Sequence, residues 1–515
     1  MPGIKEALTV VRKTLLSTTA AAPTTVKPFD RIPGPSGIYN VPVVGTALLL
    51  YPFSDIKLNK LHRLFRYLHQ KYGKIVKFRS GLKETVFLFD PEYIAQAMQN
   101  EGKYPDRTTM PIIQAYYTRT GKRSLSIFQG EEWQRIRSPL QQKLKPAAIA
   151  TYTSHQESCA NDLTEWINQN KNNSPDLKLA ISHYVTDANS VALFNKQLRL
   201  ITAGKLSKHN ENVEFLKNVN IVFESVAKSV YTANLFRFLR TPLYNRYEAA
   251  MDSVLGFCVK RVEEELETGR KHPEENILYA LINDESIPKE AKPFALAMFM
   301  YAGIETTTNA ILWLLYCLAA FPEKQEVLWD EIKETCPDSL TVQAIGHMPY
   351  LKACLKETFR SIFPTVNGSI RKMPEDLEIG GYCIPKGTLV NFCHNALSRS
   401  PEYFEDPDDF IPERWLSGQN SAETQRLMSI CSLPFGFGKR NCLGRRLAEQ
   451  EIFIAVIKIL QKFSLSLSSP QTLTSIDCLS LSSPQTLTSI DSNVSYRGLV
   501  VTDVPLTIQF TARCM

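Results

Sequence analysis

The sequence lacks an apolar run long enough to cross a membrane. A spanning helix needs about 20 consecutive, mostly apolar residues. The nearest stretch, Val41 to Phe53, is interrupted by Pro42, Gly45 and Thr46. The sequence therefore predicts no helical membrane anchor.

Cysteine pairs and runs of like charge are also missing. The 11 cysteines of the 515 residues are odd in number and form no C-x-x-C pair, which fits a reducing compartment better than a disulfide framework. The net charge of +7 is modest, and no long run of Lys or Arg indicates nucleic acid as a partner. A hydrophobic content of 44% and a charged content of 22% are ordinary for a globular protein.

Acidic residues are scarce at the N-terminus. In residues 1–31, five Lys and Arg face two acids, a net charge of +3 (5 minus 2), and Ser and Thr are frequent. Leu8, Val11 and Leu15 share one helical face. This composition is typical of a mitochondrial transit peptide, so we predict one over residues 1–30, cleaved or disordered. The alternative is a disordered tail without a targeting role.

The proline-rich stretch that begins at Arg31 predicts a stiff entry into one domain over residues 31–515. Apolar spacing predicts a helix over Asp55–Tyr72, and Asp90 and Pro91 start another that ends near Gly102. Residues 105–130 read as an irregular polar loop. Helical patterns then dominate from Glu131 to about Ile362, with a break at Gly269 and Pro273.

Strand patterns occur in both halves of the chain. Ile75–Phe78 and Thr85–Phe89 predict a hairpin, and the stretches that begin at Leu377 and Thr388 return to strand spacing. The predicted fold class is therefore mainly α with minor β sheets, in one domain built from interleaved segments.

A tandem copy of 14 residues lies near the C-terminus. Leu465 to Cys478 recurs as Leu479 to Ser492 with only the last residue changed. We interpret residues 465–492 as one strand-and-turn element duplicated, with one copy placed in a surface loop; an assembly error in the sequence is the alternative. Long loops cost little extra free energy to extend, so folding tolerates either.

The stretch from Phe435 to Gly444 reads F-G-F-G-K-R-N-C-L-G. Its glycines allow tight bends, and Lys439 and Arg440 place positive charge beside Cys442, which favours the thiolate form that binds metal. An amphipathic helix follows, and its N-terminal dipole also favours an anionic sulfur. On its own, the loop is also compatible with a buried structural cysteine.

This stretch resembles the haem-ligand signature of cytochromes P-450, F-x-x-G-x-R-x-C-x-G. The fixed positions are filled by Phe435, Gly438, Arg440, Cys442 and Gly444. The resemblance implies a cytochrome P-450 fold in which haem b lies between the Thr306 helix and the Cys442 loop and helix. Cys442 would be the axial thiolate ligand, which pushes electron density toward the iron.

Residues 302–307 read A-G-I-E-T-T within an apolar helical run from Phe294 to Phe321. A threonine hydroxyl in a helix can bond the carbonyl four residues back, and glycine loosens the turn. The motif resembles the family's A-G-x-(D/E)-T, which implies that Thr306 and Glu305 protonate bound dioxygen. A kinked core helix is the alternative.

The E-x-x-R pair Glu357 and Arg360 lies on one helix face, where an exposed ion pair is the default reading. In the family this pair is buried and joined by an arginine from a P-E-R segment, here Arg414. The resemblance makes these three residues a structural lock rather than catalysts. Bidentate arginine geometry suits a buried lock.

Propionate anchors are implied by resemblance at Trp133, Arg137, Arg371 and Arg440. Trp133 and Arg137 are also one helical turn apart, so a plain cation–π pair is the alternative. Basic residues near the thiolate predict the docking site of an acidic ferredoxin through electrostatic steering. They are Lys352, Lys356, Lys439, Arg445 and Arg446.

The patterns G-R-R-x-A-E-x-E from Gly444 and K-A-x-x-K-E-T from Lys352 resemble the mitochondrial class of animal cytochromes P-450. The resemblance implies a monooxygenase that hydroxylates a lipophilic, sterol-like or xenobiotic substrate with O2. Electrons would come from a mitochondrial [2Fe-2S] ferredoxin and its reductase, and the enzyme would bind peripherally to the matrix side of the inner membrane. The alternatives are a haem-thiolate isomerase or dehydratase, a non-catalytic haem protein, and a microsomal enzyme served by a flavoprotein reductase.

Overall fold

The computed structural model describes residues 26–513 with gaps. The gaps are 42–44, 81–82, 123–126, 171–176, 195–196, 203–204, 207–210, 232–235, 237, 268–276, 286, 288, 290–291, 337–339, 367, 468–493, 498 and 503–507. Residues 1–25 of the predicted transit peptide, the predicted break at Gly269 and Pro273, and the tandem copy beyond Leu467 lie outside the described residues.

Two compact units make up the chain, and each is assembled from segments far apart in the sequence. The first unit comprises Met1–Thr108, Thr365–Pro407 and Arg414–Lys439, and the second comprises Thr109–Pro364, Asp408–Glu413 and Arg440–Met515. The strand patterns in both halves of the chain predicted this interleaving. The assignment of residues 31–515 to one domain stays a prediction.

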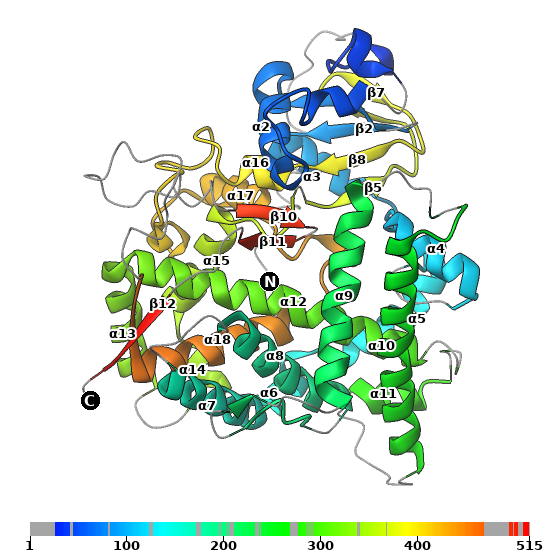
Figure 1. Ribbon diagram of the computed structural model, residues 1–515. Helices are drawn as coiled ribbons and strands as arrows, with labels where there is room; N and C mark the ends of the chain where they lie inside the picture. Colours follow the sequence, from blue (N-terminus) through cyan, green and yellow to red (C-terminus); the bar gives the residue numbers. More distant parts are fainter. Residues whose placement is uncertain are drawn as a thin grey trace. The chain divides into compact units, whose positions relative to one another are not determined.

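The first unit is built on a four-stranded sheet of order β1-β2-β8-β5 (Figure 1). The predicted hairpin is confirmed, since β1 and β2 pair antiparallel, and β2 pairs in parallel with β8 from the other half of the chain. The elements of this unit are η1 (Phe29–Arg31), η2 (Gly37–Asn40), η3 (Gly45–Leu49), η4 (Leu58–Lys60), α2 (Leu61–Tyr72), β1 (Ile75–Ser80), β2 (Lys83–Leu88), α3 (Pro91–Gln99), β5 (Ile370–Lys372), β6 (Leu377–Ile379), β7 (Tyr382–Ile384), β8 (Leu389–Phe392), α16 (His394–Leu397) and α17 (Ala422–Cys431).

In the first unit, one predicted boundary agrees with the structure and two differ from it in part. The helix expected over Asp55–Tyr72 begins only at Leu61, because the chain forms the 3₁₀ turn η4 first; it does end before Gly73, which has φ +91°. Helix α3 starts as predicted, since Asp90 Oδ1 accepts from the amides of Glu92 (2.9 Å) and Tyr93. The folded part begins before Arg31, because the Lys27 amide donates to Gly381 at 2.9 Å.

The second unit is mainly helical. Its elements are α4 (Pro111–Thr120), α5 (Gly130–Lys143), α6 (Pro146–Ala150), α7 (Thr153–Asn170), α8 (Leu177–Phe194), β3 (Ile201–Thr202), β4 (Lys205–Leu206), α9 (Glu211–Tyr231), α10 (Pro242–Glu267), α11 (Ile277–Asn283), α12 (Lys292–Ala320), α13 (Pro322–Thr335), α14 (Val342–Gly346), α15 (Pro349–Ser361), α18 (Arg445–Lys462), β9 (Phe463–Leu467), β10 (Val494–Arg497), β11 (Leu499–Thr502) and β12 (Ile508–Ala512). The short helices η7 (Pro412–Trp415) and η8 (Gly438–Arg440) lie where the chain passes from one unit to the other.

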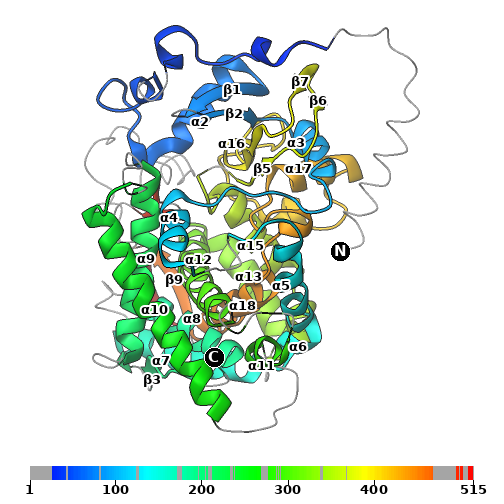
Figure 2. The ribbon, with the colours of Figure 1, turned by 90° about the vertical axis from the view of Figure 1, so that its right-hand side faces the viewer.

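Helix α12 is the core element of the second unit and matches the apolar run predicted from Phe294 to Phe321. It packs against α8, α10 and α18, while α9 and α10 lie side by side in both ribbon views (Figures 1 and 2). Most of its residues from Thr307 to Ala319 are buried on every face, as expected for a helix inside the core. The predicted fold class, mainly α with minor sheets, is confirmed.

The prediction of an irregular loop over residues 105–130 was wrong in its middle. Helix α4 occupies Pro111–Thr120, where Pro111 stands at the first helical position and Gly121 ends the helix with φ +68°. Its buried residues include the adjacent pairs Ile112–Ile113 and Tyr116–Tyr117. Adjacent apolar residues give a weak amphipathic pattern, so periodicity did not reveal this helix.

Among the described helices, none is by itself long and apolar enough to cross a membrane; α12 and α13 meet the length and composition only together, and they bend by 111° at the break between them.

Candidate functional site

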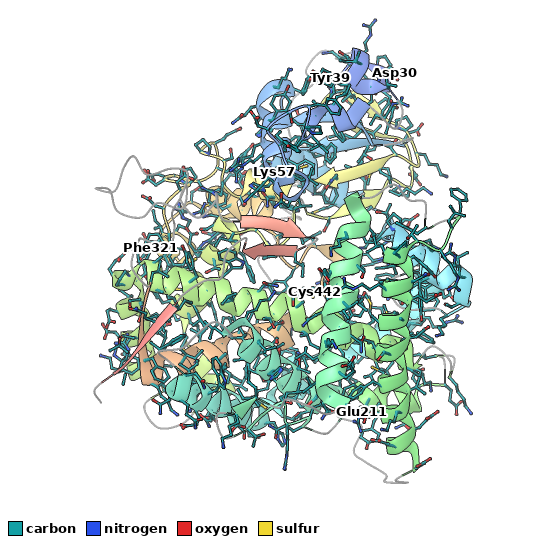
Figure 3. The ribbon with its side chains drawn as sticks, in the orientation of Figure 1. Asp30, Tyr39, Lys57, Glu211, Phe321 and Cys442 are labelled. Atoms are coloured by element: carbon teal, nitrogen blue, oxygen red, sulfur yellow. The ribbon has the colours of Figure 1, made fainter. Side chains whose placement is uncertain are left out.

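Cys442 lies in the loop that leads directly into α18 (Figure 3). Its side chain is exposed, although most cysteines in the described part of the chain are buried. Helix α18 starts at Arg445 with Gly444 as its N-cap residue, so the thiol lies just before a helix N-terminus, as the sequence predicts. The positive end of that helix favours an anionic sulfur.

Two arginines gather around Trp133 beside this thiol. The Arg440 guanidinium stacks on the Trp133 ring at 3.8 Å, and that of Arg137 lies 5.4 Å from it. Arg137 Nη2 donates to the carbonyl and the side-chain oxygen of Asn441, both at 2.7 Å, and Arg440 Nη2 donates to Gln129 Oε1 at 2.6 Å. The second unit therefore brings three of the four predicted anchors together next to Cys442.

The fourth predicted anchor, Arg371, belongs to the first unit. It is nearly buried, and its Nε donates to Glu101 Oε2 at 2.7 Å. Gly438 has φ +66°, and a Cβ there would collide with Glu101 Oε1, so both its conformation and its space require glycine. Glu101, the partner of Arg371, was not revealed by the sequence. Phe435 is half-buried in the same unit.

Cys442, Arg137 and Arg440 fit a haem site better than a site in which protein side chains alone bind a metal ion. The described residues contain no cluster of three or more His, Cys, Asp or Glu that could hold a metal, so Cys442 would be a single protein ligand. Arg137 and Arg440 are each less than a tenth exposed and lie beside the thiol. Buried guanidinium groups suit the carboxylates of an anionic prosthetic group.

Thr306 and Glu305 are consecutive on α12 but differ in their surroundings. Thr306 is exposed and its hydroxyl donates to the Ala302 carbonyl at 2.7 Å, which is the bond four residues back that the sequence predicts. Glu305 Oε1 instead accepts from Lys178 Nζ of α8 at 2.6 Å and from Asn309 Nδ2 at 3.1 Å. Neither of these two partners of Glu305 was predicted from the sequence.

Glu357 and Arg360 form a fully buried ion pair on α15, both with 0% exposed side chains. Arg360 donates bidentately to Glu357, from Nε at 2.9 Å and from Nη2 at 2.8 Å. The pair also fastens the following chain, since Glu357 accepts from the Ile411 amide and Arg360 donates to the Asp409 carbonyl. This burial excludes the exposed-pair reading.

Arg414 belongs to the first unit, where it donates to the carbonyls of Glu405 (2.8 Å) and Asp406 (3.3 Å). Its contribution to the lock stays a prediction.

The predicted docking residues divide between the units. In the second unit, Lys356 is exposed, and its pKa is lowered by partial desolvation and by the charges of Arg445 and Lys352. Arg445 pairs with Glu449 at 2.8 Å, and Arg446 donates to the Leu144 carbonyl. Lys439, in the first unit, donates to the Lys103 carbonyl at 2.6 Å. Lys352, Lys356 and Arg445 therefore form one basic cluster.

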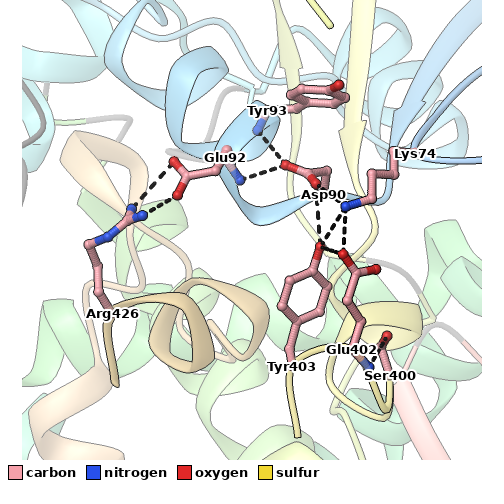
Figure 4. Close-up of polar contacts among 8 residues, drawn as sticks. All are labelled: Lys74, Asp90, Glu92, Tyr93, Ser400, Glu402, Tyr403 and Arg426. Atoms are coloured by element: carbon pink, nitrogen blue, oxygen red, sulfur yellow. Dashed lines mark hydrogen bonds and ion pairs between the residues drawn. The ribbon is translucent and has the colours of Figure 1, made fainter. Parts of the chain in front are cut away.

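A polar cluster in the first unit was not revealed by the sequence (Figure 4). Lys74 Nζ contacts Asp90 Oδ2 at 2.9 Å and Glu402 Oε1 at 2.6 Å, and Arg426 pairs with Glu92. The cluster joins the N-terminal ends of β1 and α3 to the turn around Glu402 and to α17. Its groups are paired among themselves, so we assign it to the stability of this unit.

Comparison with known proteins agrees with this geometry. The sequence model of the family described as cytochrome P-450 matches residues 35–490. The chain is 29% identical over 442 residues to the mitochondrial 1,25-dihydroxyvitamin D(3) 24-hydroxylase of Rattus norvegicus, covering 84% of this chain and 83% of that protein. It is 31% identical over 420 residues to the mitochondrial sterol 26-hydroxylase of Mus musculus, covering 77% and 78%.

Proposed function

This chain belongs to the cytochrome P-450 family and is a haem monooxygenase, and from that premise we propose that it hydroxylates a lipophilic, sterol-like or xenobiotic substrate with electrons from a ferredoxin. The observation that carries the proposal is the exposed Cys442 thiol at the start of α18, beside two nearly buried arginines.

Cys442 would hold haem b as its thiolate ligand, and Trp133, Arg137, Arg440 and Arg371 would bind its propionates. When bound, the haem activates O2 so that one oxygen atom enters the substrate and the other leaves as water. The positive end of α18 would favour the anionic form of this sulfur. Phe435, Gly438 and Gly444 shape the loop around the ligand.

Thr306 and Glu305 would supply protons on the oxygen side. Thr306 is exposed, and the bond of its hydroxyl to the Ala302 carbonyl fixes the orientation of that hydroxyl on α12. Glu305 lies next to it and is fixed by Lys178. A hydroxyl near the reacting oxygen and a carboxyl that supplies its proton form a short relay.

The substrate proposal rests on the relatives and on the apolar lining of the second unit. One relative is named as a 1,25-dihydroxyvitamin D(3) hydroxylase and another as a sterol hydroxylase. Partly exposed apolar side chains on α9 and α12, Phe223, Met298 and Phe299, pack against the core near the turn before Glu305. These side chains suit a bulky apolar molecule rather than a charged one.

The electron donor and location follow from charge and from the relatives' names. The basic cluster of Lys352, Lys356 and Arg445 suits a small acidic ferredoxin with its reductase. The relatives are named as mitochondrial, and the basic, acid-poor N-terminus fits import into that organelle. We extend this proposal to peripheral binding at the matrix side of the inner membrane.

The experiment that tests the assignment is the carbon monoxide spectrum of the reduced protein. The native protein should absorb at the wavelength typical of thiolate ligation, and Cys442→Ala should lose both this band and haem retention. Cys431→Ala, which removes a buried thiol of α17, should keep the band. An unchanged spectrum in the Cys442 variant would overturn the assignment.

A further inference from the structure

Glu451 is a fully buried carboxyl on α18 that the proposed reaction does not use. Its side chain is 0% exposed and lies in the second turn of the helix that follows Cys442. Oε2 accepts from Asn189 Nδ2 of α8 at 3.1 Å, and Oε1 lies 3.5 Å from Gln156 Nε2 of α7. The Glu451 carbonyl accepts from the Tyr184 hydroxyl at 2.8 Å. One residue thus connects α18 to two other helices.

The surroundings of Glu451 favour its neutral form. Burial raises the pKa of its carboxyl well above the ordinary value, and the Asn189 amide lowers it only in part. The titratable groups that face it are the Cys159 thiol of α7 and the Tyr184 phenol of α8, whose own pKa values are raised by burial. Among the described residues no cation faces the carboxyl, so ionising it would bury an uncompensated charge.

Neighbouring amides extend these contacts. Gln450, the preceding residue on α18, donates to Gln156 Oε1 at 2.7 Å and to the Ile149 carbonyl at 3.1 Å. A buried amide and carboxyl network holds a single geometry only while each member keeps its partner. The first turns of α18 are therefore fixed to α7 by polar contacts as well as by apolar packing.

Asn189 also lies against α12. A Cβ added to Gly303 would be 3.5 Å from both terminal atoms of the Asn189 side chain, so glycine leaves room for this amide beside the turn that precedes Glu305. Asn189 thus touches α12 and the Glu451 carboxyl with the same side chain. At Gly303, where α12 lies against the Asn189 side chain, α12 carries no charged group.

We propose that Glu451 is a positioning residue for the Cys442 thiolate. Through Gln156 and Asn189 it holds the first turns of α18, and with them the ligand loop, in the orientation that thiolate ligation needs. This inference rests on the proposed role of Cys442 as haem ligand. Because burial disfavours the ionised carboxyl, raising the pH until Glu451 ionises should disturb this geometry and reversibly reduce the thiolate-ligated fraction.

The test compares Glu451→Gln and Glu451→Asp in the full-length haem protein. Glutamine keeps the length and remains neutral, so this variant should retain the thiolate-type carbon monoxide band at neutral pH and should no longer lose it at alkaline pH. Aspartate is one methylene shorter and cannot reach both amides, so the thiolate-ligated fraction should fall several-fold at neutral pH. The blue-shifted band of a neutral thiol ligand measures the lost fraction.

Glu157→Gln is the matched control. Glu157 pairs with Lys458 at 3.1 Å and so also joins α7 to α18, but at the surface. It should keep the native spectrum and the native alkaline midpoint. The proposal is overturned if Glu451→Gln keeps the native alkaline midpoint, or if Glu451→Asp unfolds at a lower temperature with an unchanged ratio of the two bands. Retention of the band by Cys442→Ala would instead refute the ligand assignment.

Discussion

Lys178 and Glu305 form an ion pair of 2.6 Å that ties α8 to α12 directly before Thr306. The Glu305 side chain is only 13% exposed, whereas that of Lys178 is 45% exposed. Glu305 is therefore held by a lysine of α8 that is itself partly exposed to solvent. We infer that Lys178 orients Glu305 for proton delivery to the Thr306 side.

Replacement of Lys178 by Gln should lower the yield of hydroxylated product per electron pair. An ion pair with one partly exposed partner contributes at most about 1 kcal/mol, so we expect a loss of about two- to fivefold. Substrate-induced spectral shifts should stay native, because Lys178 does not touch the thiolate loop in the contacts described. Lys217→Gln, at an exposed pair on α9, is the control. A native product yield in Lys178→Gln would contradict the role.

Thr306→Val should divert electrons from product to hydrogen peroxide. Valine keeps the shape of threonine but removes the hydroxyl, and a positioned proton donor is worth about 10²- to 10⁴-fold in rate. Peroxide and product are measured together at saturating substrate. Thr308→Val is the matched control, because the Thr308 hydroxyl is buried and has no hydrogen-bond partner in the described part of the chain. The Thr308→Val variant should form as much product per electron pair as the native enzyme, and its stability should equal or exceed that of the native enzyme.

Local patterns predicted the Thr306 bond to Ala302 and the start of α3 at Asp90, because both contacts join residues close in sequence. The partners of the candidate site residues were not predictable in this way. Lys178 is separated from Glu305 by 127 residues, and Glu101 from Arg371 by 270. Neither partner belongs to a motif, so only the folded chain reveals them.

The length of a helix decided whether its apolar pattern could be recognised in the sequence. Helix α12 was found because its apolar run is long. Helix α4 was missed because it has only 10 residues, so its apolar pairs Ile112–Ile113 and Tyr116–Tyr117 repeat only once at helical spacing. The loop around Cys442 was found by its glycines, and the positive φ values at Gly436 (+69°) and Gly438 (+66°) show why they are needed.

Glu357→Ala should destabilise the protein strongly. The change leaves Arg360 charged in a site with 0% exposure, and removing one partner of a buried pair costs about 3–5 kcal/mol. Thermal unfolding of the haem protein measures the loss. Asp330→Ala is the control, since Asp330 and Lys333 form a pair of the same i,i+3 spacing on the surface of α13. Equal melting temperatures for the two variants would show that the lock is not structural.

Stability should fall as pH drops from about 6.5 toward 4, and His183 should account for part of the loss. Burial lowers the pKa of His183 from 6.5 to about 4. In this window the unfolded chain binds a proton that the folded chain excludes, so acid favours unfolding by an amount on the order of 3 kcal/mol. Thermal unfolding between pH 4 and 8 should show a shallower slope for His183→Gln. The exposed His347 provides the control, His347→Gln, which should keep the native slope.

Replacing Lys352 and Lys356 by Gln should weaken the reaction with ferredoxin at low salt. Burial lowers the pKa of Lys356, and the charges of Arg445 and Lys352 lower it further, so these three residues lie close enough to act on a partner as one positive patch. Electrostatic steering raises association rates at low ionic strength and is screened over about 10 Å at 0.1 M salt. We therefore expect a rise of about two- to tenfold in the KM for ferredoxin at low salt, which shrinks as salt is added. Replacing Lys333 on α13 and Lys217 on α9 together by Gln makes the same change in net charge and is the control; an equal effect of that variant would place the docking site elsewhere.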